Sequence, residues 1–173
     1  SVSLSPLHLF TIKLMFEGEQ DTLNMTENTQ PALLLSGVAA LHVLQDEAEK
    51  TVPELASAVA GHSLGEYTAL VAAGVLSFAD GLRLVRLRGQ AMQKAVPVGK
   101  GKMAASLGLD NAKVAEVAEQ CGVFVANDNS NGQVVLSGNL KDLDMLIEDL
   151  NKTSIKNIKL PVSAPFHCKL MKP

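Results

Sequence analysis

The sequence predicts an α/β fold in two parts, and three observations support this prediction. An apolar segment, a tight turn with a serine and a helical segment follow one another over residues 56–73. Strand and helix patterns then alternate in the order β-α-β-β-α-β over residues 99–160, the order of a ferredoxin-like subdomain. Finally, 173 residues with 47% hydrophobic content are enough for one domain with a sizeable core.

The first part of the chain is predicted to be largely helical. Residues 1–28 give no clear pattern, and residues 10–15 fit a strand or a helix equally well. A helix is expected over residues 31–45, because the proline at its start is tolerated in the first turn of a helix. Another is expected over residues 77–95, which begin with the spacing of a capping box.

The turn between these helices carries the motif Gly-x-Ser-x-Gly at residues 61–65, the sequence form of a nucleophile elbow. Residues 56–60 are expected to form a short buried strand, and the two glycines are expected to let strand and helix approach closely. Ser63 Oγ then projects at a helix N-terminus, where the backbone N–H of Leu64 can bind an oxyanion. Ser63 is therefore the candidate nucleophile of an α/β-hydrolase-like core.

Residues 99–160 are predicted to be an insertion into this core. Predicted strands and helices alternate at residues 103–109, 110–120, 123–126, 134–136, 139–151 and 155–160, with a turn at residues 127–132. The chain then returns with a Pro-Val-Ser segment. We therefore assign residues 1–98 and 161–173 to the hydrolase-like core and residues 99–160 to the ferredoxin-like subdomain.

One arginine lies where the helix over residues 77–95 should be apolar. On a helical wheel that starts at Leu82, Arg88 falls at about 240°, within the apolar arc, whereas Arg83 and Arg86 fall on the polar side. A buried guanidinium must be paired, and arginine binds carboxylates in a bidentate fork. Its partner is either an acidic side chain of the protein, or the carboxylate of an acyl substrate. A stem that extends out to water is the third option.

His167 is the leading candidate for the general base. It follows the last predicted strand in a loop-like segment, after Ser63 in the chain, which is the order found in α/β serine hydrolases. A histidine there can take the serine proton and return it to a leaving group. Four acidic residues between the two could orient the imidazole, and none stands out: Glu66, Asp80, Asp110 and Asp128. A backbone carbonyl or an amide could serve instead.

The composition excludes several classes of protein. A net charge of −3 is not that of a dedicated nucleic-acid binder. Two cysteines without zinc-site spacing indicate a reducing compartment and predict no metal. The longest apolar run, residues 31–44, is too short to span a bilayer, and no secretory signal is visible. We expect a cytoplasmic protein, or one of an organelle matrix. Because the sequence lacks an initiator Met, we also expect it to be part of a longer chain.

Several motifs together resemble the acyltransferase family of fatty-acid and polyketide synthesis, which includes malonyl-CoA:acyl carrier protein transacylases. They are GHSLGEY at residues 61–67, the arginine in LRG at residues 87–89, the inserted subdomain and SAPFH at residues 163–167. TQPAL at residues 29–33 and NSNGQVV at residues 129–135 are also similar to family segments. The resemblance covers about residues 17–173.

The resemblance implies a ping-pong reaction and a central parallel sheet. Ser63 would attack the thioester of malonyl-CoA, and the malonyl group would pass from the serine to the phosphopantetheine thiol of acyl carrier protein. His167 would be the base and acid, Arg88 would hold the malonyl carboxylate, and the Leu64 N–H would be half of the oxyanion hole. No metal or cofactor is implied, and we expect a monomer.

Two further residues are assigned to the substrate by the same resemblance. Gln30 would contact the substrate, and Phe166 would disfavour an α-methyl branch, although one methyl group is worth only about 1–3 kcal/mol in a pocket. Lysines that could dock an acidic carrier protein form two alternative sets, which are Lys100 with Lys102, and Lys156, Lys159, Lys169 with Lys172.

The sequence also departs from the family. Residues 1–18 lack the opening strand and the Gly-Gln-Gly loop that supplies the second oxyanion donor, and the chain stops six residues after His167. We therefore expect a chain truncated at both ends, with an incomplete core. Two alternatives stay open, a serine hydrolase of esters or thioesters and an inactive fragment of an acyltransferase. A hydrolase requires neither an inward Arg88 nor a ferredoxin-like insertion, and an inactive fragment is expected to fold poorly or to form no acyl-enzyme.

Overall fold

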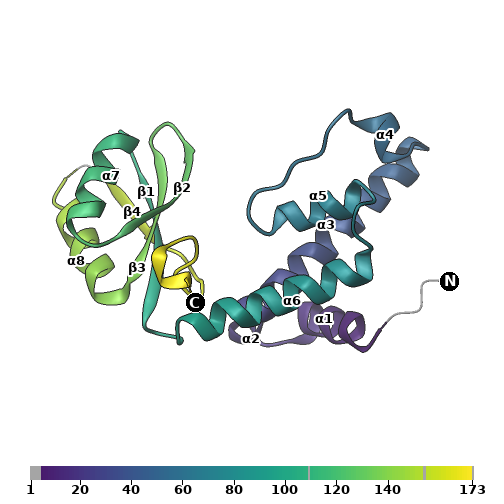
Figure 1. The fold of residues 1–173 in the computed structure, drawn as a ribbon, viewed down its shortest axis with the longest axis horizontal. Coiled ribbons are helices and arrows are strands. Elements are labelled where there is room, and N and C mark those ends of the chain that lie inside the picture. Colours follow the sequence, from purple (N-terminus) through teal and green to yellow (C-terminus); the bar gives the residue numbers. More distant parts are fainter. Residues whose placement is uncertain (1–4, 109, 154, 173) are drawn as a thin grey trace. The chain divides into compact units, whose positions relative to one another are not determined.

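A computed structural model describes residues 5–108, 110–153 and 155–172 (Figure 1). The chain divides into two compact units, Ser1–Gln90 and Ala91–Pro173. Each unit is described by itself. Among the described residues, no helix is both long and apolar enough to cross a membrane.

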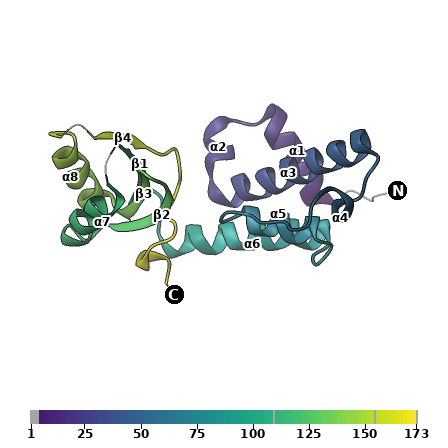
Figure 2. The same cartoon turned by 90° about the horizontal axis from the view of Figure 1, so that it is seen from above.

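Unit 1 is helical. Its helices α1 to α6 are Pro6–Glu17, Gln20–Asn24, Thr26–Ala48, Val52–Leu55, Gly65–Ala72 and Phe78–Ala95, the last of which continues into unit 2. The long α3 contacts α1, α2 and α5 (Figure 2). Leu34, Val38, Leu82 and Val85 form the core between α3 and α6, with Tyr67 of α5 packed against it.

The helix predicted over residues 31–45 is longer than expected, because α3 begins at Thr26. Pro31 is therefore inside the helix, where its ring nitrogen has no N–H to donate to the carbonyl four residues earlier. That carbonyl belongs to Glu27, and Arg86 Nη1 donates to it at 2.8 Å. An arginine from α6 thus replaces the hydrogen bond that the proline removes, which is why the helix continues through Pro31.

The strand predicted over residues 56–60 is not found. These residues are exposed and have no strand assignment, and the described part of unit 1 contains no other strand. A strand needs a neighbour to accept and donate its backbone hydrogen bonds, so an apolar sequence alone does not produce one. The prediction of a buried strand before the serine turn is wrong for this structure.

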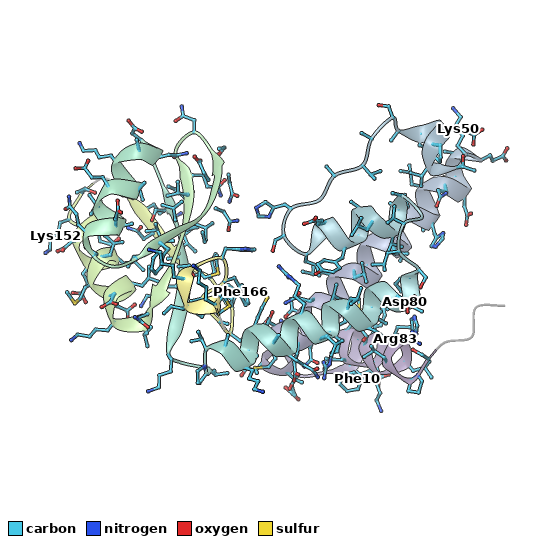
Figure 3. The ribbon with its side chains drawn as sticks, viewed as in Figure 1. Phe10, Lys50, Asp80, Arg83, Lys152 and Phe166 are labelled. Carbon is cyan, nitrogen blue, oxygen red and sulfur yellow. The ribbon has the colours of Figure 1, made fainter. Side chains whose placement is uncertain are left out.

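Helix α6 confirms its predicted limits. Its first turn is closed by Ser77, whose Oγ accepts the Asp80 N–H at 3.1 Å and donates to the Asp80 carboxylate at 2.7 Å. Arg83 lies next to this carboxylate at 2.8 Å, on the outer face of the helix (Figure 3). Near its other end Gly89 touches α3 so closely that an added Cβ would lie 2.5 Å from the Glu27 Cα.

Unit 2 is built on a four-stranded sheet, and the predicted element order is confirmed. The order is β1 Gly101–Leu107, α7 Asn111–Gln120, β2 Phe124–Ser130, β3 Gln133–Asn139, α8 Leu140–Leu150 and β4 Lys156–Lys159. The strands lie in the order β2-β3-β1-β4, and all three pairs are antiparallel. The predicted turn at residues 127–132 is shorter than expected, because β2 and β3 pair as far as Ser130 and Gln133. Leu109, the end of the first predicted strand, lies outside the described residues.

Different segments pack on the two faces of this sheet. Helices α7 and α8 pack on one face, over a core that includes Ala104, Leu136, Leu143 and Leu146 (Figure 1). The other face presents Met103, Ala105 and Val135, and the segment after β4 packs there through Leu160, Val162 and Phe166. This segment, which ends in the short helix η1 Lys169–Met171, is therefore held by the sheet.

Candidate functional site

The serine turn of unit 1 has the strained backbone that the motif predicts. Ser63 has φ +53°, a left-handed value that is uncommon for residues other than glycine. The turn is closed by hydrogen bonds from the N–H of Gly65 to the His62 carbonyl at 2.9 Å and from the N–H of Glu66 to the Ser63 carbonyl at 3.2 Å. Such strain persists only where the surrounding structure enforces it. Residues strained in this way are common at functional sites.

The glycines of the motif have different roles. A Cβ on Gly61 would lie 1.9 Å from the carbonyl carbon and oxygen of Gly65, so no other residue fits there without moving the turn. A Cβ on Gly65 would meet nothing within 4 Å. The close contact of Gly61 is with Gly65 inside the turn, so it does not confirm the expected approach of a strand to a helix. Leu64 is the N-cap of α5, so its backbone N–H lies in the first turn, where helices lack internal acceptors.

Arg88 reaches this turn from α6. Its Nη2 donates to Ser63 Oγ at 3.2 Å, its Nη1 donates to Gln30 Oε1 at 2.6 Å, and its guanidinium lies 5.8 Å from the centre of the Tyr67 ring. Both hydrogen-bond acceptors are neutral. Among the residues that the structure describes, no ion pair joins Arg88 to a carboxylate. A half-buried guanidinium with neutral neighbours is suited to bind the carboxylate of a ligand.

Arg86 differs from the prediction, which placed it on the polar side of α6. Only 22% of its side chain is exposed, and it contacts the carbonyl and carboxylate of Glu27 and the side chain of Asn28. Its long stem lets the charged end reach back from the flank of the helix to the Glu27 carbonyl. Two arginines of α6 therefore approach α3. Arg86 has a structural contact with Glu27, and Arg88 contacts Gln30 and Ser63.

Gln30 is held from two sides. It is buried on α3, and its Nε2 donates to the hydroxyl oxygen of Thr26, one turn earlier, at 2.8 Å. Its Oε1 accepts from Arg88. Sequence reasoning assigned Gln30 to the substrate and missed Thr26 and Tyr67. The four-residue spacing from Thr26 to Gln30 was the available signal, because residues so spaced share one face of a helix.

His167 belongs to unit 2, where it also has a left-handed backbone with φ +55°. The segment before it is anchored. Gln93 Nε2 donates to the Ser163 carbonyl at 3.3 Å, Ala164 and Pro165 are buried, and Gly101 packs directly under Pro165. The neighbouring Phe166 is half-buried against the sheet (Figure 3). His167 and Phe166 are candidates named from the sequence, and the contact of Gln93 with this segment appears only in the structure.

Three of the four acidic candidates for orienting the imidazole have structural contacts of their own. Asp80 binds Ser77 and Arg83, Asp110 caps α7 through the Ala112 N–H at 3.0 Å, and Asp128 contacts Asn111. Across the described ranges, no three His, Cys, Asp or Glu side chains come together as a group that could hold a metal ion.

Comparison with known protein families identifies the class to which this α/β chain belongs. Residues 8–173 match the model described as "Acyl transferase domain". The chain therefore belongs to the acyl transferase domain family.

Among curated relatives, the malonyl CoA-acyl carrier protein transacylase of Escherichia coli strain K12 is 46% identical over 162 residues, which are 91% of this chain and 51% of the relative. Among solved structures, the acyl-carrier-protein S-malonyltransferase of Burkholderia pseudomallei 1710b has a TM-score of 0.83 at 46% identity, over 94% of this chain and 53% of that one. A type II PKS acyl-carrier protein in complex with its malonyl-transacylase gives 0.84 at 41% identity, over 93% and 52%. This chain thus spans about half the length of these relatives.

Proposed function

We propose that the protein transfers a malonyl group from malonyl-CoA to the phosphopantetheine thiol of acyl carrier protein, through a malonyl ester on Ser63. The observation that carries this proposal is the guanidinium of Arg88, 3.2 Å from Ser63 Oγ and without a carboxylate partner among the described residues. In a malonyl ester one methylene separates the ester carbonyl from the carboxylate. A guanidinium next to the serine oxygen matches an acyl group of that length.

The first half-reaction forms the ester. Ser63 Oγ attacks the thioester carbonyl while its proton passes to His167, and the negative charge on the carbonyl oxygen is stabilised by the Leu64 N–H. The tetrahedral intermediate collapses with cleavage of the carbon–sulfur bond. The sulfur takes the proton from His167 and leaves as free CoA. Arg88 and Gln30 hold the malonyl carboxylate throughout.

The second half-reaction is the same chemistry in reverse. The pantetheine thiol gives its proton to His167 and attacks the Ser63 ester, and the serine oxygen recovers the proton as it leaves. The reaction has no redox change, so we propose that it needs no metal or cofactor. Phe166 is proposed to disfavour branched acyl groups.

We propose that the chain also has the fold of this family, with a hydrolase-like core and a ferredoxin-like subdomain. The β-α-β-β-α-β order with an antiparallel sheet supports a ferredoxin-like subdomain over residues 99–160. The hydrolase-like core, with its parallel sheet and residues 1–98 and 161–173, is proposed from the serine motif and the family match. We further propose a monomer in the cytoplasm or an organelle matrix, with no nucleic-acid or membrane partner.

Intact-protein mass spectrometry after mixing with malonyl-CoA tests the proposal. We expect a malonyl adduct on the wild type, none on Ser63→Ala and less on Arg88→Ala. Adding carrier protein should move the adduct to its pantetheine. Release of free malonate without need for an acceptor would indicate a hydrolase, and a folded wild type without an adduct would indicate an inactive chain.

A further inference from the structure

Four side chains of unit 1 form a continuous hydrogen-bonded series that ends at the proposed nucleophile. Thr26 Oγ1 accepts from Gln30 Nε2 at 2.8 Å, and Gln30 Oε1 accepts from Arg88 Nη1 at 2.6 Å. Arg88 Nη2 then donates to Ser63 Oγ at 3.2 Å. Thr26 and Gln30 are 4% and 5% exposed, so water has little access to the start of this series.

The Gln30 amide has to point in one direction for this series to exist. Its oxygen and its nitrogen have nearly the same shape, so only their partners decide which one faces Arg88. The guanidinium can only donate, so it requires the oxygen. The Thr26 hydroxyl, which can accept, faces the nitrogen and satisfies it. The guanidinium thus sets the direction of the amide, and the Thr26 hydroxyl, by accepting from Nε2, holds the buried Gln30 side chain in place against Arg88.

We infer that Thr26 is a positioning residue for the acyl carboxylate, acting through the Gln30 amide on the guanidinium of Arg88. This inference rests on the function proposed above. Thr26 touches neither Ser63 nor the acyl group. It keeps Gln30 Oε1 on Nη1, and thereby keeps Nη2 directed at the serine, where the carboxylate of the malonyl ester has to bind.

If Thr26 had a purely structural role, its replacement would lower stability without a selective effect on malonylation. The same turn of the helix offers a matched control for this case. Thr29 lies in the same first turn of α3 and is half-buried, but its Oγ1 donates to the Leu23 carbonyl at 2.6 Å and the Met25 carbonyl at 3.2 Å. Those hydrogen bonds tie α3 to the preceding segment. Loss of the Thr29 hydroxyl therefore weakens the fold without touching the amide of Gln30.

The test compares Thr26→Val, Thr26→Ser and Thr29→Val in the intact chain. Two acyl donors are used, malonyl-CoA, which carries a carboxylate, and p-nitrophenyl acetate, which does not. The rate of Ser63 acylation is followed by mass spectrometry, and the melting temperature is measured for each variant. Thr26→Ala repeats the measurement if the valine variant does not fold, since alanine removes the same hydroxyl and favours helix.

We expect Thr26→Val to slow malonylation about 5- to 10-fold, as loss of one hydrogen bond predicts, while acetylation changes less than about 2-fold. Thr26→Ser should restore malonylation, and Thr29→Val should lower the melting temperature with an unchanged ratio of the two rates. An unchanged ratio in folded Thr26→Val and Thr26→Ala, with malonylation of the wild type intact, overturns the inference alone. Absence of a malonyl adduct on the wild type overturns the proposed function and the inference together.

Discussion

Arg88 and Ser63 are 25 positions apart in the chain, and Nη2 of the first donates to Oγ of the second at 3.2 Å. The contact joins the middle of α6 to the strained turn before α5. It also places the charge that would select the acyl group directly on the atom that would carry it. Under the proposed function, selection of the acyl group and formation of the ester would therefore be coupled at Ser63 Oγ.

Replacement of Arg88 by lysine should impair malonylation almost as strongly as replacement by alanine. A lysine keeps the charge, but its three N–H donors share one nitrogen, so it cannot bind a carboxylate in a planar fork while also reaching Gln30 and Ser63. Loss of one hydrogen bond to a charged group corresponds to about 1.5–3 kcal/mol, or roughly 10- to 150-fold in rate. The measurement is the rate of adduct formation with malonyl-CoA for Arg88→Lys. A rate equal to that of the wild type would show that charge alone is sufficient.

Gly89→Ala should destabilise unit 1. The new Cβ would lie 2.5 Å from the Glu27 Cα and 2.7 Å from the Thr26 carbonyl oxygen, and backbone cannot move aside as a side chain can. We expect a loss of about 1–3 kcal/mol in the free energy of unfolding, in spite of the better helix propensity of alanine. Urea unfolding measures it, with the exposed neighbour Gln90→Ala as a control that should change little. Equal effects of the two substitutions would contradict close packing at Gly89.

Gly101→Ala should disturb the segment that carries His167. Its Cβ would lie 2.3 Å from Cγ of the buried Pro165, two residues before the histidine. We expect destabilisation of about 1–3 kcal/mol and a shift in the NMR signals of the His167 ring. Gly138→Ala is the matched control on the same sheet, because its Cβ would be 3.5 Å from Val123. Unshifted His167 signals in Gly101→Ala would argue against this anchor.

The start of α6 should make stability depend on pH in the acid range. The hydrogen bond from the Ser77 hydroxyl, more than the pairing with Arg83, lowers the pKa of the Asp80 carboxyl below its ordinary value. A pKa that is lower in the folded state means that this stabilisation is present above about pH 4 and is lost as the pH falls through the folded pKa.

Urea unfolding from about pH 6 to pH 3 tests this linkage. Ser77→Ala and Asp80→Asn should both weaken the decline in stability toward acid, and Arg83→Gln should weaken it less than Ser77→Ala, because the hydroxyl is the larger cause. A larger effect for Arg83→Gln would reverse the assignment.

Charge reversal of the lysines at the start of β1 should weaken binding of acyl carrier protein to the enzyme. In the sheet register Lys159 pairs with Ala104, and Lys156 pairs with Leu107, so Lys159 lies at the same end as Lys100 and Lys102 while Lys156 lies at the other. We expect Lys100→Glu with Lys102→Glu to raise the KM for carrier protein without changing acylation by malonyl-CoA. Lys156→Glu is the control. An unchanged KM in the double variant would exclude this surface as the docking site.

The sequence predicted those parts of the site that depend on local chemistry. The left-handed Ser63 and the indispensable Gly61 follow from the motif itself, and the inward Arg88 follows from helical periodicity. The β-α-β-β-α-β order was predictable because its strands are joined by short connections and its turn chemistry is explicit.

Features that depend on distant partners were not predictable. Residues 56–60 have the apolar composition of a strand but no neighbour to pair with among the described residues of unit 1. The passage of α3 through Pro31 depends on Arg86, which is 59 positions from the carbonyl that it binds. The role of Thr26 appears only when the direction of one buried amide is known.

The left-handed backbone at Ser63 and His167 implies a conflict between the proposed activity and thermal stability. Glycine adopts such angles without strain, so Ser63→Gly and His167→Gly should each give a more stable protein than the corresponding alanine variants. Selection for heat resistance alone would therefore favour glycine over alanine at these two positions, although neither residue could support the proposed reaction. Under the proposed function, serine and histidine at these backbone angles would reflect selection for activity rather than for thermal stability.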